Sequence, residues 1–287
     1  MAGLFFSACA AVCVLGVLAI AFYMIIKGVP AVRTVGLRNL FLGAEWKPTA
    51  EVPKFGIRYI LLTSAAGTLL AAGMGVPVGI LTAVYLAEVS DGKKGRFVRT
   101  AIEVLAGIPS VIYGLLGVYL LCPAMYRLER KLFAHSDSHQ YTGGANLLSA
   151  VIVLAVMMLP TIIYISETAI RSVGTEIRAA SAALGASGVQ TIFRAVLPAA
   201  RPGIAMAVVL GVGRAVGEAM AITLVSGGSV NAPFPFRSVR FLTTAIVSEM
   251  GYSQGLHRQV LFTIGLVLFG CVLLVNLAAK LILKGRA

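Results

Sequence analysis

Six long apolar stretches constrain this chain more than any other feature of its sequence. Each is longer than the roughly 20 helical residues needed to cross about 30 Å of hydrocarbon. Strands of a membrane barrel would be only about 10 residues long, with strict alternation of apolar and polar residues, and no such alternation appears. We therefore predict an all-α membrane protein with six transmembrane helices, at residues 4–26, 59–89, 100–122, 147–169, 202–226 and 260–283.

The composition supports a membrane protein and excludes the soluble and disordered classes. Hydrophobic residues make up 59% of the 287 residues, charged residues only 12%, and the mean hydropathy is +0.93. A soluble domain is nearer to half apolar and a quarter charged. Because the connections between the apolar stretches are short, we expect one transmembrane domain over residues 1–287, with no separate soluble domain.

The net charge of +13 comes from 24 Lys and Arg against 11 Asp and Glu. In a soluble protein it would suggest nucleic acid, but here cations at helix ends facing lipid phosphates explain most of it. Six spans place both termini on one side of the membrane. Lys and Arg are divided almost equally between the two sides, so the charges alone leave the orientation open.

The sequence contains no pattern that points to an active site or a metal site in this chain. A phosphate-binding loop of the form G-x-x-x-x-G-K-[ST] is missing, as are H-E-x-x-H and G-x-S-x-G. His135 and His139 could pair on a helix turn, but a polar loop is the better interpretation. We expect a non-enzymatic chain without a metal, and any ATP that it uses to be bound by another subunit.

The connection between the fourth and fifth stretches predicts two short helices that project from the membrane. Its first half is rich in alanine, which favours helix, and Gly185 and Gly188 bracket a turn. Its second half has an apolar face at helical spacing, and we expect Pro198 to end this helix. A unit this small should dock on something. The alternative is that the face, at Val189, Ile192, Phe193, Val196 and Leu197, packs against this chain's own helix ends.

The same segment resembles a known family. Residues 179–198, with the spacing Ala-Ala-Ser-x3-Gly-x11-Leu-Pro, are similar to the "EAA" loop of bacterial ABC-importer permeases, which inserts into the ATPase subunit. The chain has Ala179 where the family has a glutamate, and Ala195 where it has an isoleucine. The resemblance implies coupling to an ATPase through Ala180, Ser181, Gly185, Val189, Ile192, Phe193, Leu197 and Pro198.

Three further strings resemble the PstC family of phosphate-importer permeases. They are Leu-Ala-Gly-Ile-Pro-Ser at 105–110, Gly-Arg-Ala-Val-Gly-Glu at 213–218, and Glu-Met-Gly at 249–251 followed by Gly-Leu-His at 255–257. The resemblance implies the type I ABC importer fold, with a peripheral first helix, a core at about 59–283 and coupling helices at about 176–198. It also implies a bacterial inner-membrane complex that imports phosphate. Its other members would be a PstA-like permease subunit, two PstB-like ATPase subunits that bind ATP and magnesium, and a PstS-like phosphate-binding protein.

Arg214 is the candidate substrate contact because it lies at the centre of the stretch 202–226, where a charge is costly. Glu218 lies four residues further on, so a continuous helix would place both on one face. Gly213 and Gly217 would let a neighbouring helix approach closely. A guanidinium suits an oxyanion, and a partly neutralising carboxylate would let the anion leave again. The alternative is a purely structural ion pair.

Pro109 and Ser110 are weaker pathway candidates. Pro109 interrupts an apolar stretch and frees backbone groups, which are tolerated where protein or water covers them. An ordinary kink is the alternative. For the whole chain, the alternatives are a permease for sulfate, molybdate or phosphonate, a secondary transporter or channel, and a membrane scaffold or sensor.

Overall fold

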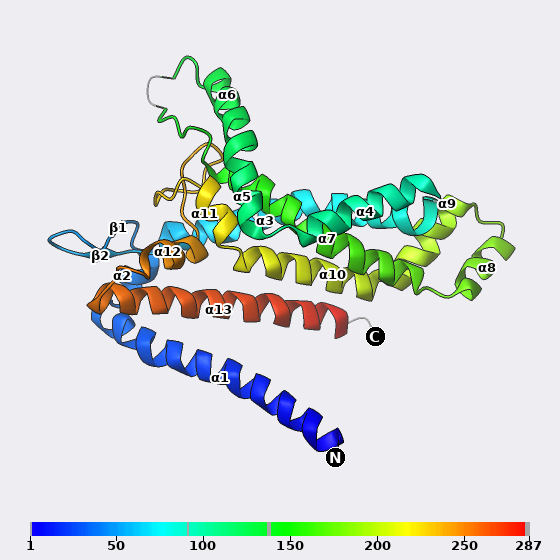
Figure 1. The fold of residues 1–287 in the computed structure, drawn as a ribbon, viewed down its shortest axis with the longest axis horizontal. Coiled ribbons are helices and arrows are strands. Elements are labelled where there is room, and N and C mark those ends of the chain that lie inside the picture. The colour runs from blue at the N-terminus through cyan, green and yellow to red at the C-terminus, as the bar shows by residue number, and fades with distance from the viewer. Residues whose placement is uncertain (1, 91, 137–138, 285–287) are drawn as a thin grey trace.

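The computed structural model describes residues 2–90, 92–136 and 139–284 as an elongated helical bundle (Figure 1). Six of its helices are long and apolar enough to cross a membrane, which confirms the predicted number: Phe5–Val35, Arg58–Val89, Ser110–Leu132, Leu147–Arg171, Gly188–Gly217 and Gly255–Leu277. The elements are α1 (Ala2–Val35), α2 (Leu37–Leu42), β1 (Trp46–Lys47), β2 (Lys54–Phe55), α3 (Arg58–Val84), α4 (Lys93–Gly107), α5 (Ser110–Leu116), α6 (Cys122–Leu132), α7 (Leu147–Arg171), α8 (Thr175–Ala183), α9 (Gly188–Thr191), α10 (Leu197–Gly217), α11 (Met220–Val225), α12 (Leu242–Glu249) and α13 (Gly255–Lys284).

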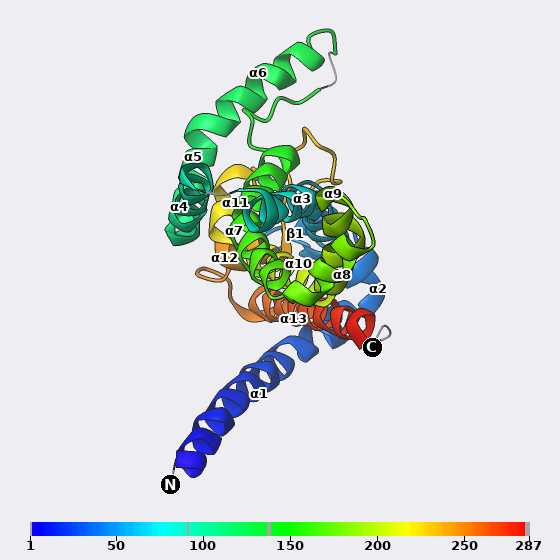
Figure 2. The ribbon, with the colours of Figure 1, turned by 90° about the vertical axis from the view of Figure 1, so that its right-hand side faces the viewer.

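The two ends of the bundle differ in what they carry. Helices α8 and α9 project from one end, and the start of α1 and the end of α13 lie toward the same end (Figure 1). We call this the α8 end. The β1–β2 hairpin, α12 and the loop between α11 and α12 lie at the opposite end, which we call the α12 end. Helix α6 extends away from the bundle, as Figure 1 and Figure 2 both show.

Helix α7 is the centre of the bundle and packs along both α3 and α10. The helices approach closely because glycines of α3 and α10 face α7. A Cβ atom on Gly79 of α3 would lie 2.7 Å from Cγ2 of Ile162, and one on Gly211 of α10 would lie 2.6 Å from Cγ1 of the same isoleucine. Lipid chains are as apolar as the helices, so helices associate in membranes largely through such close packing.

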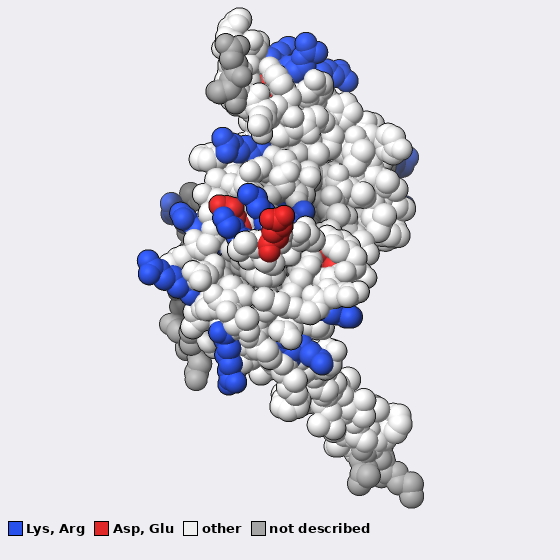
Figure 3. All heavy atoms as spheres, turned by 90° about the vertical axis from the view of Figure 1, so that its left-hand side faces the viewer, with Lys and Arg blue, Asp and Glu red and all other residues white. Residues whose placement is uncertain are grey.

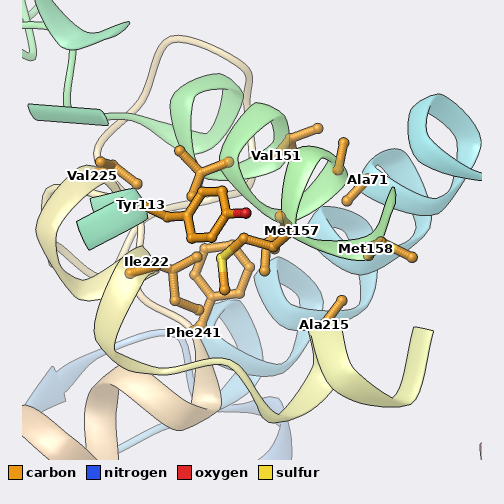
Figure 4. Packing of buried hydrophobic residues seen from close by; sticks show 14 of the residues in the cluster. Ala71, Tyr113, Val151, Met157, Met158, Ala215, Ile222, Val225 and Phe241 are labelled. Atoms are coloured by element: carbon orange, nitrogen blue, oxygen red, sulfur yellow. The ribbon is translucent and has the colours of Figure 1, made fainter. Parts of the chain in front are cut away.

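A second part of the core fills the space where α5 and α11 meet α7. Figure 4 shows Tyr113 of α5 beside Ile222 of α11, with Met157 of α7 and Phe241 next to them. The Tyr113 hydroxyl donates a hydrogen bond to the carbonyl oxygen of Leu105 at 2.6 Å, which satisfies the one polar atom of this side chain. The cluster therefore joins elements on both sides of the break between α4 and α5.

The predicted third span, 100–122, is wrong as a continuous helix. Helix α4 ends at Gly107, the backbone is extended at Ile108 and Pro109, and α5 begins at Ser110. The reason is local, because proline lacks an N–H group and disfavours helical backbone in the residue before it. The helical run that is long and apolar enough to span is Ser110–Leu132.

The predicted fifth span, 202–226, is wrong at both ends. An uninterrupted helical run extends from Gly188 to Gly217, so Pro198 does not end a helix. A wider π-helical turn at Ile192–Val196 comes directly before α10, and Pro198 stands at the start of α10. There the missing N–H group costs little, because the preceding turn already departs from the α-helical hydrogen-bond pattern. At the other end, the backbone becomes extended at Glu218.

At the α12 end, one buried carboxylate joins four segments. Glu249 is 4% exposed and accepts hydrogen bonds from Trp46 Nε1, at 3.1 Å to each oxygen, and from Arg240. His257 Nε2 lies 2.7 Å from the same carboxylate. The Glu249 carboxylate thereby holds together the hairpin, the loop before α12, α12 and α13.

Within the hairpin, Lys54 and Lys47 hydrogen-bond to Glu45 and lower the pKa of its carboxyl below the ordinary value.

Gly79→Val tests the close packing of α3 on α7. The added side chain meets Ile162, so we expect a loss of about 1–3 kcal/mol of stability and a lower unfolding temperature in detergent. Gly73→Val on the same helix is the matched control, because nothing lies within 4 Å of its Cβ position. Equal unfolding temperatures for the two variants would contradict the packing argument.

Candidate functional site

Arg214 lies in the last turn of α10, next to the point where the helix breaks. Its side chain is exposed in this chain, and among the residues that the structure describes no carboxylate lies within 4.0 Å of the guanidinium. The predicted pairing with Glu218 on one helix face is therefore wrong. Glu218 lies outside the helix, because its backbone is extended at ψ 131°.

Glu218 instead fixes the break between α10 and α11. Its carboxylate accepts a hydrogen bond from the backbone N–H of Ala221 at 3.0 Å, in the first turn of α11. Its carbonyl oxygen accepts one from the hydroxyl of Thr243 at 2.7 Å. A carboxylate at a helix N-terminus satisfies an otherwise unpaired donor and favours the helix dipole. Glu218 thus positions the chain after Arg214 without neutralising it.

Gly213 and Gly217 do not bring a helix of this chain close to Arg214. Nothing lies within 4 Å of a Cβ atom built on either glycine. The close-approach glycines of α10 are Gly203 and Gly211, which face α7. The surface around Arg214 is therefore uncovered in the described chain, and Met220, at the start of α11, is 51% exposed.

Pro109 and Ser110 lie at the second helix break, between α4 and α5. Helix α5 packs on α11, and a Cβ atom on Gly114 would lie 2.9 Å from the Cα of Ala221. The breaks at Pro109 and Glu218 therefore lie just before two helices, α5 and α11, that pack on each other. Interrupted helices leave backbone carbonyl groups without helical partners, which is tolerated in a membrane only where protein or water covers them.

The projecting unit at the α8 end has the predicted turn at Gly185. This residue has φ +78°, and the N–H groups of Gly185 and Ala186 donate to the carbonyl groups of Ala182 and Ser181, which closes α8 with a Schellman motif. Ser187 then caps α9, and its side chain and that of Gln190 exchange hydrogen bonds with each other's backbone. The hydroxyls of Ser181 and Thr191 lie 2.9 Å apart and join the two helices.

Only part of the predicted apolar docking face is available. Val196 is fully buried and Ile192 is partly buried against the core of this chain, so for these two the alternative of self-packing holds. Val189 and Phe193 are 66% and 55% exposed, and Ala180 is exposed beside them. Leu184 at the turn is 89% exposed, and the sequence pattern did not identify it as part of this face. Leu197 and Pro198 lie half-buried at the start of α10.

Ion pairs connect the projecting unit to the bundle and link helices within it, and the sequence pattern did not predict them. Arg178 of α8 lies 2.5 Å from Glu88, in the π-helical turn Tyr85–Val89 that extends α3. Glu167 of α7 is 7% exposed and pairs with Arg99 of α4 and with Arg171 one helical turn away. The spacing of Glu167 and Arg171 was the only sequence signal for this network.

His139, one member of the histidine pair, contacts a carboxylate of this chain. His139 Nε2 lies 2.8 Å from the buried carboxylate of Glu129, and no group of three or more metal-ligating residues occurs among the described residues. The neighbouring positions 137 and 138 lie outside them.

Comparison with known proteins agrees with this geometry. The family described as "Binding-protein-dependent transport system inner membrane component" matches residues 75–286. The probable ABC transporter permease protein YqgH of Bacillus subtilis is 36% identical over 91% of this chain and 83% of its own length. The phosphate transport system permease protein PstC of Mycobacterium leprae is 30% identical over 93% of this chain and 87% of its own length.

Solved structures place the fold among ABC importer permeases. A bacterial alginate ABC transporter matches with a TM-score of 0.66 at 18% identity, over 96% of this chain and 92% of the other. The MetNI methionine ABC transporter matches with a TM-score of 0.59 at 23% identity, over 80% of this chain and 98% of the other. The chain is a multi-pass membrane protein that belongs to the family of binding-protein-dependent transport system inner membrane components, the permeases of ABC importers.

Proposed function

We propose that this chain is the transmembrane subunit of an ATP-driven importer that moves inorganic phosphate into the cytoplasm. The observation that carries the cargo assignment is the similarity to phosphate permeases, which extends over 93% of the chain for the Mycobacterium leprae relative and 98% for that of Xylella fastidiosa. The exposed Arg214 without a carboxylate partner supports an anionic cargo, because a guanidinium binds phosphate oxygens in a bidentate manner.

The uncovered surface around Arg214 supports a pathway completed by a second subunit. We propose a PstA-like permease on this surface, so that Arg214 lines the path between the two permeases. Pro109 and Ser110 lie next to this path, and Glu218 fixes the backbone beside Arg214. A PstS-like phosphate-binding protein would deliver the anion at the α12 end.

The α8 end would be cytoplasmic and would dock on one of two PstB-like ATPases, which would bind ATP and magnesium, while this chain itself would be non-catalytic. The exposed Leu184, Val189 and Phe193 provide the apolar contact. The ion pair between Arg178 and Glu88 would transmit movement of the docking unit to α3. Both termini would then be cytoplasmic, in the bacterial inner membrane.

Phe193→Asp tests the docking surface. Docking would bury this side chain, so a charge there should weaken binding of the ATPase at least tenfold, as measured by co-purification at graded ATPase concentrations. Phe193→Leu keeps an apolar side chain and should bind normally. Full binding by the aspartate variant would rule this surface out.

Leu184→Cys tests the orientation. In a variant without the four native cysteines, a membrane-impermeant maleimide should label this exposed position in inside-out vesicles and not in sealed, right-side-out cells. Labelling in intact cells would show that the α8 end lies outside the cytoplasm, which would contradict both the proposed orientation and the docking of an ATPase there.

Arg214→Gln tests the function. In proteoliposomes that contain the complete transporter, ATP-driven phosphate uptake should fall at least tenfold, which is about 1.4 kcal/mol, while the complex still assembles. Glu218→Gln is the control, because an amide oxygen can still accept the hydrogen bond from Ala221, and it should retain most of the uptake. Parental uptake by the Arg214 variant would refute its role, and saturable uptake of sulfate in place of phosphate would refute the cargo.

A further inference from the structure

A polar pocket lies at the α12 end, and Arg214 is not among the residues that line it. It has a volume of about 450 Å³ and lies between the segment 139–142, which precedes α7, and the loop between α11 and α12. Every residue that lines it is polar, in a chain that is 59% hydrophobic: His139, Gln140, Tyr141, Thr142, Ser229, Asn231, Arg237 and Ser238. The described lining includes a guanidinium and no carboxylate.

A buried carboxylate holds the first wall of the pocket rigid. Glu129 of α6 is fully buried, and it accepts hydrogen bonds from the backbone N–H and the hydroxyl of Thr142, at 3.1 Å each. His139 Nε2 lies 2.8 Å from the same carboxylate. The imidazole also stacks on Phe133 with ring centres 3.8 Å apart. His139 therefore helps to hold this wall in place through Glu129 and Phe133.

Backbone and side-chain hydrogen bonds fix the second wall. Ser238 Oγ accepts from the Ser229 N–H at 3.2 Å, and the Asn231 amide donates to the Ser238 carbonyl at 2.9 Å. The carbonyl oxygen of Arg237 accepts from the N–H of Leu147 at 3.1 Å, which anchors this residue to the start of α7. The pocket is thus formed before any ligand arrives, which lowers the entropic cost of binding.

The Arg237 side chain has no carboxylate partner within 4.0 Å in the described parts of the chain. Its guanidinium carbon lies over the ring of Phe234, 5.6 Å from the ring centroid. The hydroxyls of Ser229 and Ser238 and the Gln140 amide add neutral donors. A planar guanidinium with several hydroxyl and amide donors and no acid suits a tetrahedral oxyanion.

The charge of the surrounding face favours the same ligand. Figure 3 views this end and shows Lys and Arg spread over the face and its rim, while Asp and Glu gather near the middle. The exposed Glu45 is already paired with Lys47 and Lys54, at 3.2 and 3.1 Å. A positive field of this kind raises the local concentration of anions and their rate of arrival.

We propose that this pocket is a binding site for a small phosphate-type oxyanion at the α12 end, separate from the path beside Arg214. Arg237 supplies the charge, and Ser229, Ser238 and the Gln140 amide supply further donors. The proposal rests on the proposed function only for the preference for phosphate. The same chemistry could come from free phosphate or from the phosphate of a lipid headgroup, and the experiment separates these sources.

The experiment measures protection of a cysteine in the pocket. Gln140→Cys is introduced into the transporter without native cysteines, the complex is placed in phosphatidylcholine nanodiscs, and the rate of maleimide labelling is measured. Phosphate should slow labelling at least fivefold relative to chloride at equal ionic strength. Arg237→Gln should reduce this protection to less than twofold, and Arg237→Lys should restore part of it. Val52→Cys, which is 74% exposed in the hairpin at the same end, should show no protection.

The lipid arm repeats the labelling without added phosphate in nanodiscs that contain phosphatidylglycerol. Arg237-dependent protection that appears only there identifies the headgroup as the ligand, whereas protection in phosphatidylcholine that requires added phosphate identifies the free anion. Equal labelling rates under all these conditions, or protection that survives Arg237→Gln, would overturn the proposal. Arg214→Gln should leave the protection intact, so failure of this site and failure of the transport proposal give different results.

Discussion

The contact of α7 with α3 and α10 is the interaction on which the rest of the structure depends. It is made at the glycine faces of α3 and α10, so that Ile162 of α7 meets backbone on both sides. A membrane offers little hydrophobic gain when apolar surfaces meet, so the stability of this contact comes from dispersion over closely matched surfaces. Because α7 is held on both flanks, the other helices can be short, broken or exposed without loss of the fold.

The placement of helix breaks follows from this arrangement. Helices α3 and α7 are long and provide the rigid part, whereas the chain is interrupted after α4 and after α10. The interrupted ends meet where α5 packs on α11. Glu218 and Tyr113 satisfy polar groups there, through hydrogen bonds to the Ala221 N–H and the Leu105 carbonyl. The break after α10 therefore lies next to Arg214, in the last turn of that helix, and not where Gly79 and Gly211 pack on α7.

The number of spans and the turn at Gly185 could be predicted from the sequence, because apolar length and glycine conformation are local properties. The breaks at Ile108 and Glu218 could not be predicted from hydropathy, since an apolar run reads the same whether its helix is continuous or interrupted. The proline at 109 was a usable signal for the first break. The break at Glu218 depends on a hydrogen bond from Thr243, which is remote in sequence.

The sequence singles out Arg214 as a candidate, but the pairing with Glu218 that it predicts is wrong. Arg214 stands out because a charge inside an apolar stretch needs a reason, but its distance from Glu218 depends on the backbone between them. Only part of the predicted docking face is exposed, for a similar reason: helical spacing identifies an apolar stripe but does not show which part of it the same chain covers. Val196 is covered, whereas Val189 and Phe193 are not.

The uninterrupted helical run from Gly188 to Gly217 connects the exposed docking residues to Arg214 through a single helix, which can act as a lever. Val189 lies at one end of this run and Arg214 near the other, about 38 Å apart at 1.5 Å per residue. A tilt of about 5° imposed at the first extremity would displace the guanidinium by about 3 Å, comparable to the length of a hydrogen bond. The π-helical turn and the two prolines that follow it, Pro198 and Pro202, are the points where the lever can flex. The stiffness of the segment from Ile192 to Pro202 therefore determines how much of a displacement at Val189 reaches the guanidinium of Arg214.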